Sequence, residues 1–119
     1  MSNEADELAA TINEQPDSLH ADYTPSVYAL VRLGLAALPA VLPLLESEDR
    51  FTRMRAQRVL EGVTRDWSKR NAPAQTRPGG EHRWRALWSE NGSYDWQADA
   101  AARAASIGRW KEWLRRMQP

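Results

Sequence analysis

The sequence contains no cysteine, which excludes a disulfide framework and a thiolate zinc site. Histidine is almost as rare, and His20 and His82 lack the i, i+4 pairing of a helical metal site. The carboxylates Asp66 and Glu112 each stand beside a tryptophan, without a partner residue that would make a catalytic pair. The glycines at 79–80 indicate a turn rather than a phosphate-binding loop. We therefore expect no enzyme, no cofactor and no bound metal.

We also expect no targeting segment in this sequence. The N-terminal stretch MSNEADELAATINEQ is acidic, so we do not expect it to act as a signal peptide. No window is expected to reach the roughly 18 apolar residues that span a bilayer. The apolar share of 42% is that of an ordinary globular chain, and 119 residues suit one domain, 1–119. These features favour a single cytoplasmic domain.

The charges are distributed unevenly along the chain, although the net charge is zero. Residues 1–49 hold nine acids and one base, Arg32, whereas residues 50–119 hold fifteen bases and seven acids. Fourteen of the sixteen bases are arginine, which binds carboxylates and phosphates through paired hydrogen bonds. Either the acidic half packs on the basic half within one fold, or the basic half meets an acidic partner.

Capping and proline signals predict about six helices, and no segment alternates apolar and polar residues as a strand would. A capping helix in residues 1–21, with Ser2 as its N-cap, ends at Pro16. Thr24 with the following proline opens a second helix that stops near Gly34. The remaining helices are expected at 35–46, where two prolines either cap or kink the helix, then at 50–67, 82–91 and 95–117, with a Pro/Gly-rich loop at 69–81.

A spaced pattern of Asp, Arg, a small residue and a large apolar residue, D-x-x-x-R-x-x-A-x-x-x-L, recurs in these helices. It is filled by Asp49, Arg53, Ala56 and Leu60, by Asp99, Arg103, Ser106 and Trp110, and more weakly by Asp22, Ser26, Ala29 and Leu33. The small residue would admit a neighbouring helix, and the large one would fill the core. The arginine is expected to reach an aspartate carboxylate of its own or the next unit.

The stretch YALVRLGLAALPAVLPLLESEDRFTRMRAQRVL resembles the HEAT-like repeats of α-solenoid proteins. It looks like that family's L-G-x-x-A-L-P-x-L-x-x-L-L turn and helix, followed by its D-x-x-x-R-x-x-A-x-x-x-L helix. Residues 22–67 hold the best-matching repeats, and 82–117 form a tryptophan-rich helical pair. The resemblance implies an all-α fold of two to three stacked helical hairpins, as a short α-solenoid or a compact bundle. It also implies a protein that supplies a binding surface.

All six tryptophans lie after residue 66, and four of them form two pairs at helical spacing. Packing into one aromatic core is the simpler interpretation, and a platform for a ligand is the alternative. That core would contain Trp67, Trp84, Trp88, Trp110 and Trp113. Trp96 stands in a turn outside these pairs, where it would be either an exposed anchor for a partner or a staple for the last helix.

The side of the long helix opposite Ala56 mixes arginines with apolar residues. Either the apolar residues pack on a neighbouring helix while the arginines extend outward, or this side binds a partner. Partner binding predicts a small interaction module, such as a bacterial adaptor or an inhibitor of the immunity-protein type, that meets an acidic protein surface. The predicted contact residues are Phe51, Met54, Arg55, Arg58 and Trp96.

Two other functions stay open. The same arginines could bind the phosphates of a nucleic acid, although the acidic N-terminal third would repel a duplex. A structural fragment of a larger assembly would be indicated if the apolar helix at Leu35–Leu45 were exposed and self-associating. These patterns determine neither the partner nor the oligomeric state.

Overall fold

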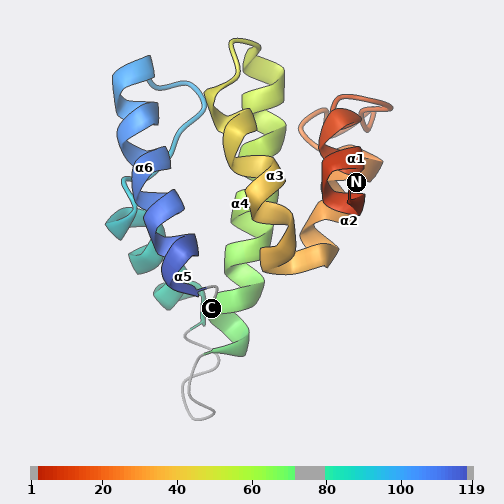
Figure 1. Cartoon of the computed structure of the whole chain (residues 1–119). Helices are drawn as coiled ribbons and strands as arrows, with labels where there is room; N and C mark the ends of the chain where they lie inside the picture. Colours follow the sequence, from red (N-terminus) through yellow and green to blue (C-terminus); the bar gives the residue numbers. More distant parts are fainter. Residues whose placement is uncertain (1–2, 72–79, 118–119) are drawn as a thin grey trace.

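The structure, a computed structural model, describes residues 3–71 and 80–117, and every regular element in these ranges is helical (Figure 1). The elements are α1 (Glu4–Ala10), α2 (Pro25–Leu33), the 3₁₀ turn η1 (Gly34–Ala37), α3 (Leu38–Val41), the 3₁₀ turn η2 (Leu42–Glu46), α4 (Arg50–Arg70), α5 (Gly80–Glu90) and α6 (Ala100–Met117). The prediction of an all-α protein is confirmed. Most of the expected 69–81 loop, residues 72–79, lies outside the described residues.

Side-chain caps begin four of the described helices, α1, α2, α4 and α6. Thr24, Asp49 and Asp99 each accept a hydrogen bond from the backbone N–H three residues later, at 2.8–3.2 Å. The predicted start of the last helix at Asp95 is wrong, because Asp95 caps a local turn and Asp99 caps α6. Gly92, with φ of +91°, follows the end of α5 as its predicted stop signal.

The first helix is shorter than predicted. Asn3 caps α1 by accepting the backbone N–H of Asp6 at 2.8 Å, and Ser2 lies outside the described residues. The helix ends at Ala10 rather than near Pro16, since the Thr11 backbone leaves the helical conformation, and the Thr11 hydroxyl pairs with that of Ser26 on α2 at 2.6 Å. Residues 11–24 therefore form a long ordered connection without helix.

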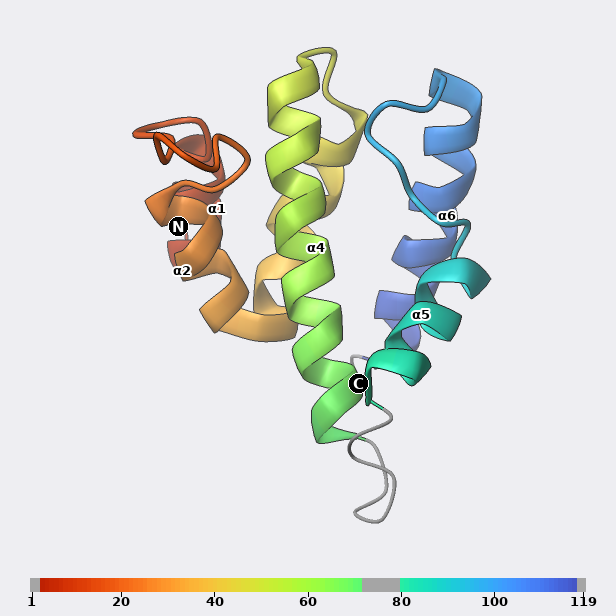
Figure 2. The same cartoon turned by 180° about the vertical axis from the view of Figure 1, so that it is seen from behind.

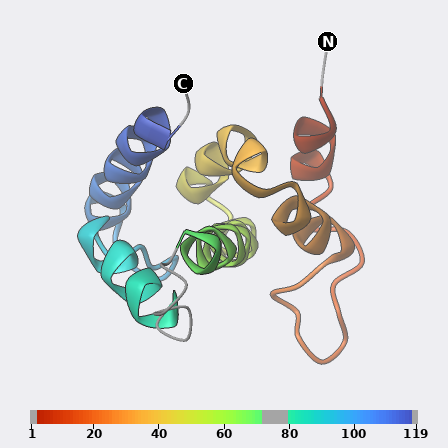
Figure 3. The same cartoon turned by 90° about the horizontal axis from the view of Figure 1, so that it is seen from below.

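The helices lie in two layers. The segment η1–α3–η2 lies between α1 and α6, while α4 lies between α2 and α5 (Figures 2 and 3). The core fills the space between the layers, and its largest fully buried aliphatic side chains are Ile12, Val27, Leu30, Leu38, Val41, Leu45, Val59, Leu60, Val63 and Ile107. The apolar edge predicted for the long helix thus faces this core.

One stretch contradicts the expectation that no segment could span a membrane. By length and composition, Pro25–Glu46 is apolar enough to cross a membrane. Core helices of globular proteins can have the same length and apolar composition. Here the stretch is not one straight helix, because Gly34 adopts φ of +70° and turns the chain between α2 and η1. Its leucines and valines contribute much of the core.

The two prolines of this stretch break the expected 35–46 helix into short turns. Pro39 lies near the start of α3, and Pro43 lies near the start of η2. One α-helical turn therefore stands between two 3₁₀ turns. Leu38, Val41 and Leu45 are buried beneath them. The exposed apolar helix that would indicate a structural fragment is therefore not observed here.

The arginines of the repeated D-x-x-x-R pattern do not reach aspartate carboxylates, contrary to the prediction. Arg53 donates to the carbonyls of Ser47 and Glu48 at 2.8 and 3.1 Å, and Arg103 donates to that of Ala98. Each carbonyl lies just before the residue that caps the same helix, since the aspartate is already capping backbone N–H groups. The small and large positions are buried as predicted, at Ala56, Leu60, Ser106 and Trp110.

The predicted tryptophan core is confirmed. Trp67, Trp113, Trp110, Trp88 and Trp84 follow one another in ring contacts of 5.2–5.4 Å between centroids. The Trp84 indole N–H donates to the Thr64 hydroxyl at 2.8 Å, and the Arg65 guanidinium lies 4.0 Å from its ring centre. Because Trp84, Trp110 and Trp113 are buried, this cluster is part of the core rather than an exposed ligand platform.

Candidate interaction surface

Two predicted contact arginines of α4 are occupied by contacts inside the molecule. Arg55 is only 7% exposed, and it donates to the Ala21 carbonyl at 3.0 Å and to the Asn13 side chain at 2.8 Å. Arg58 donates to the Asp22 carboxylate at 2.6 Å and to Glu61 at 3.0 Å. At this place the basic helix packs on the acidic N-terminal segment, as the partner-free interpretation of the charges predicted.

The Arg58 ion pairs shift its pKa. Burial alone would lower the pKa of this guanidinium, but the hydrogen bond and charge of Asp22, together with the charge of Glu61, raise it above its ordinary value. Arg58 therefore stays charged at every ordinary pH and holds the Asp22 carboxylate against α4.

The other predicted contact residues lie in different places. Phe51 is 44% exposed, with the guanidinium groups of Arg50 and Arg55 at 5.1 and 5.7 Å from its ring centre. Met54 is partly buried. Trp96 packs against the core, and its backbone is held by side chains from the opposite side of α4, at 2.9 and 3.1 Å. The structure thus brings Phe51 and Arg55 together but separates Trp96 from them. Trp96 is half-buried and its backbone is bound to α4, so it is not the exposed anchor that the sequence allowed.

Residues 17–23 form a closed surface loop, which we name the 17–23 loop. The Asp17 backbone N–H donates to the Tyr23 carbonyl at 3.0 Å, and the Asp17 carboxylate accepts the N–H groups of Leu19 and His20 at 2.8 and 3.1 Å. These two backbone hydrogen bonds hold the pKa of Asp17 below its ordinary value. At the tip, Leu19 is 86% exposed, more than any other large apolar residue in the described ranges.

Hydrogen bonds fix the base of this loop to the helices. The Thr24 hydroxyl donates to the Ile12 carbonyl at 2.8 Å in a buried contact, and the Asn13 amide donates to the Thr52 hydroxyl of α4 at 2.8 Å. Together with the Arg55 and Arg58 contacts, these bonds connect residues 12–24 to both α2 and α4. Compact loops whose ends are close together in this way are frequently functional.

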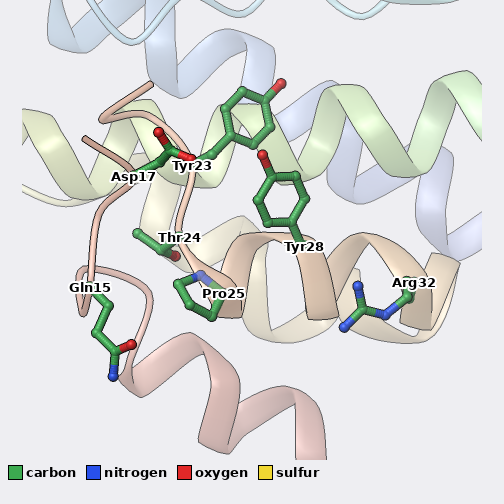
Figure 4. Close-up of a pocket in the computed structure, with 7 residues that line it drawn as sticks. All are labelled: Gln15, Asp17, Tyr23, Thr24, Pro25, Tyr28 and Arg32. Atoms are coloured by element: carbon green, nitrogen blue, oxygen red, sulfur yellow. The ribbon is translucent and has the colours of Figure 1, made fainter. Parts of the chain in front are cut away.

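A groove opens beside the loop, and Figure 4 shows its lining. The rings of Tyr23 and Tyr28 stack at 5.2 Å between centroids with an angle of 19° between their planes. We name this groove, of about 400 Å³, the tyrosine groove; its lining residues are Gln15, Asp17, Tyr23, Thr24, Pro25, Tyr28 and Arg32. Its volume lies in the range of small-molecule and peptide sites, and its wall is mainly aromatic and apolar.

The sequence interpretation missed this surface. Its signals were present but weak: Pro16 followed by Asp17 is typical of a turn closed by an aspartate side chain, and Leu19 is a single apolar residue in a polar stretch. Tyr23 and Tyr28 meet only because the loop folds back on α2, which no helical spacing predicts.

The described residues offer no candidate metal site. His20 and His82 are exposed, and residues 3–71 and 80–117 contain no group of three His, Asp or Glu placed to hold a metal. Comparisons with known protein families, curated proteins and solved structures find no match.

Proposed function

We propose that the protein is a small interaction module that binds another protein through the 17–23 loop and the tyrosine groove. The observation that carries this proposal is the exposure of Leu19 on a loop held by backbone and side-chain hydrogen bonds. When a partner covers an apolar side chain that the fold holds in water, the burial of its surface stabilises the complex. Because the loop is already ordered, binding costs little further conformational entropy.

The predicted contact residues take different roles in this proposal. Arg55 and Arg58 position the loop in this proposal, because the Nε and Nη1 atoms of each already donate to Ala21, Asn13, Asp22 and Glu61. Phe51 extends the surface, since its ring touches Arg55, which in turn holds the loop. Phosphate binding by the same arginines has less support for the same reason.

We also propose a HEAT-like relation for the pairs α1–α2 and α3–α4. Two layers, and an aspartate cap with an arginine one turn later, support it. The pair α5–α6 is placed in the reverse order, because α5 lies beside α4 and α6 beside η2. It would act as an inverted cap on the stack, and the module would serve as a cytoplasmic adaptor or inhibitor.

Site-specific photo-crosslinking tests the function. A photoreactive phenylalanine analogue replaces Leu19 in the full chain, and a control replaces Ala104, an exposed residue of α6. In a lysate of the source cells we expect a discrete, nuclease-resistant protein adduct from position 19 and none from position 104. A Tyr28→Asp substitution should reduce the adduct while leaving the helical circular dichroism unchanged. Equal adducts from both positions, or adducts lost on nuclease treatment, would overturn the proposal.

A further inference from the structure

We infer that the tyrosine groove takes an extended, proline-containing segment of the partner, with an acidic residue two positions from the proline. This inference rests on the proposed function, because it names what enters that site. It follows from the order of chemical groups along the groove and from the dimensions of α2.

The groove carries opposite charges at its two ends. Figure 4 shows Asp17 at one end, Tyr23 and Tyr28 in the middle, and Arg32 further along α2. Arg32 is exposed and forms no ion pair within residues 3–71 and 80–117. A guanidinium in this position can bind a carboxylate through two parallel hydrogen bonds. We therefore place the acidic residue of the ligand beside Arg32.

The middle of the groove has the chemistry that binds proline. The Tyr23 and Tyr28 rings stack on each other, and Pro25 lines the groove beside them. Polyproline II segments dock on aromatic-lined grooves of this type, and they enter already extended, so little entropy is lost. Their backbone carbonyls have no internal hydrogen bonds, and the hydroxyls of Tyr23 and Tyr28 can donate to them.

Helix geometry sets the spacing of the ligand. Tyr28 and Arg32 are one turn apart on α2, so about 6 Å of helix axis separates them. An extended polyproline II segment advances about 3.1 Å per residue. If the segment runs along α2 with its proline on the tyrosines, the residue two positions away is level with Arg32, which predicts the pattern proline–any–acidic.

The charges also favour a peptide over a nucleic acid. Asp17 lies at the groove, and the loop's backbone N–H groups keep its carboxylate ionised. A run of phosphates would meet this negative charge after passing the single cation Arg32. A peptide needs only one acidic residue at the Arg32 end, and a basic residue at the Asp17 end would add to its affinity.

Fluorescence anisotropy with labelled nine-residue peptides tests the inference on the full chain. The probes are identical except for a central proline–any–glutamate, proline–any–lysine or alanine–any–glutamate motif. We expect the first to bind about fivefold tighter than the lysine peptide, as an exposed ion pair and its like-charge counterpart allow. It should also bind tighter than the alanine peptide, which keeps the glutamate but lacks the proline. Arg32→Glu should reverse the preference between glutamate and lysine, whereas Arg83→Glu, an exposed control on α5, should leave it unchanged.

The outcomes separate the two proposals. Equal binding of the glutamate and lysine peptides, an unchanged preference in Arg32→Glu, or equal binding of the alanine peptide would overturn the inference. If the peptides fail while the crosslink from position 19 persists, the partner is bound by the loop but the inferred ligand is wrong. If both fail, the proposed function is wrong as well.

Discussion

Arg55→Met isolates the role of the arginine that holds the 17–23 loop. Methionine keeps the aliphatic packing of the stem and removes the guanidinium, with its donors to Ala21 and Asn13 and its contact with the Phe51 ring. A hydrogen bond to a charged group contributes about 1.5–3 kcal/mol, and both acceptors belong to exposed residues that water can reach. The lower end of that range applies to each, so we expect a loss of about 2–3 kcal/mol in the free energy of unfolding.

The matched control is Arg50→Met on the same helix. Arg50 also lies over the Phe51 ring, at 5.1 Å, but it is exposed and holds no loop carbonyl. Its loss should cost about 0.5–1 kcal/mol. Thermal unfolding followed by circular dichroism compares the two, with about 3–6 °C in Tm expected for each kcal/mol at this chain length.

A second measurement shows whether the effect is local. Amide hydrogen exchange of residues 17–23 should accelerate in Arg55→Met and stay unchanged in Arg50→Met, and the crosslink from Leu19 should weaken only in the former. If both variants melt within about 2 °C of each other and loop exchange is the same, Arg55 does not position the loop.

Three further predictions concern stability. Gly62→Ala should destabilise the protein by about 1–2 kcal/mol, because a Cβ there would lie 2.8 Å from a valine of α2, whereas Gly108→Ala, with no atom within 4 Å, should stabilise it by about 0.5–1 kcal/mol. Opposite shifts in Tm would check this pair. Tyr94→Phe removes the hydroxyl that donates to a buried η2 carbonyl at 2.7 Å and should cost about 1–2 kcal/mol at neutral pH. Burial raises the pKa of Tyr94 to about 12, so its contribution is complete below the ordinary value of 10 and falls as pH rises towards 12. Denaturant titrations at pH 8 and 11 should show a decline that is smaller in the Phe variant, where the raised pKa of Tyr23 still contributes. The pKa of Asp17 is lowered, so its contribution is complete above the ordinary value of 3.8 and is lost as pH falls through the lowered one. In the wild type, amide exchange of the 17–23 loop, corrected for intrinsic rates, should accelerate as the pH is lowered. In Asp17→Ala the same exchange should already be faster than in the wild type at neutral pH.

The sequence predicted those features that depend on neighbouring residues. The sequence predicted the caps at Thr24, which precedes a proline, and at Asp49, which precedes the long helix. Such caps are predictable because an N-cap side chain accepts a backbone N–H only three residues away. The tryptophan pairs predicted an aromatic core, because helical spacing places Trp84 with Trp88, and Trp110 with Trp113, on the same helix face.

The candidate site could not be predicted in the same way. Arg55 binds the carbonyl of Ala21, 34 residues earlier in the chain, and every residue offers a carbonyl, so no side-chain pattern identifies the acceptor. The same limit applies to Arg53 and Arg103, which were expected to reach carboxylates. Leu19 could not be identified from the sequence, because only the folded structure shows that its side chain is exposed.

The tryptophan core makes the two halves of the chain separately observable. All six indoles lie within residues 67–113, and five of them are in ring contact, so ultraviolet emission excited at the red edge reports on the C-terminal half alone. Two of the three tyrosine chromophores, Tyr23 and Tyr28, belong to the other half and line the groove. Unlabelled protein therefore carries one optical reporter for the aromatic core and another for the candidate interaction surface. If the two signals change at the same denaturant concentration, the halves unfold as one cooperative unit.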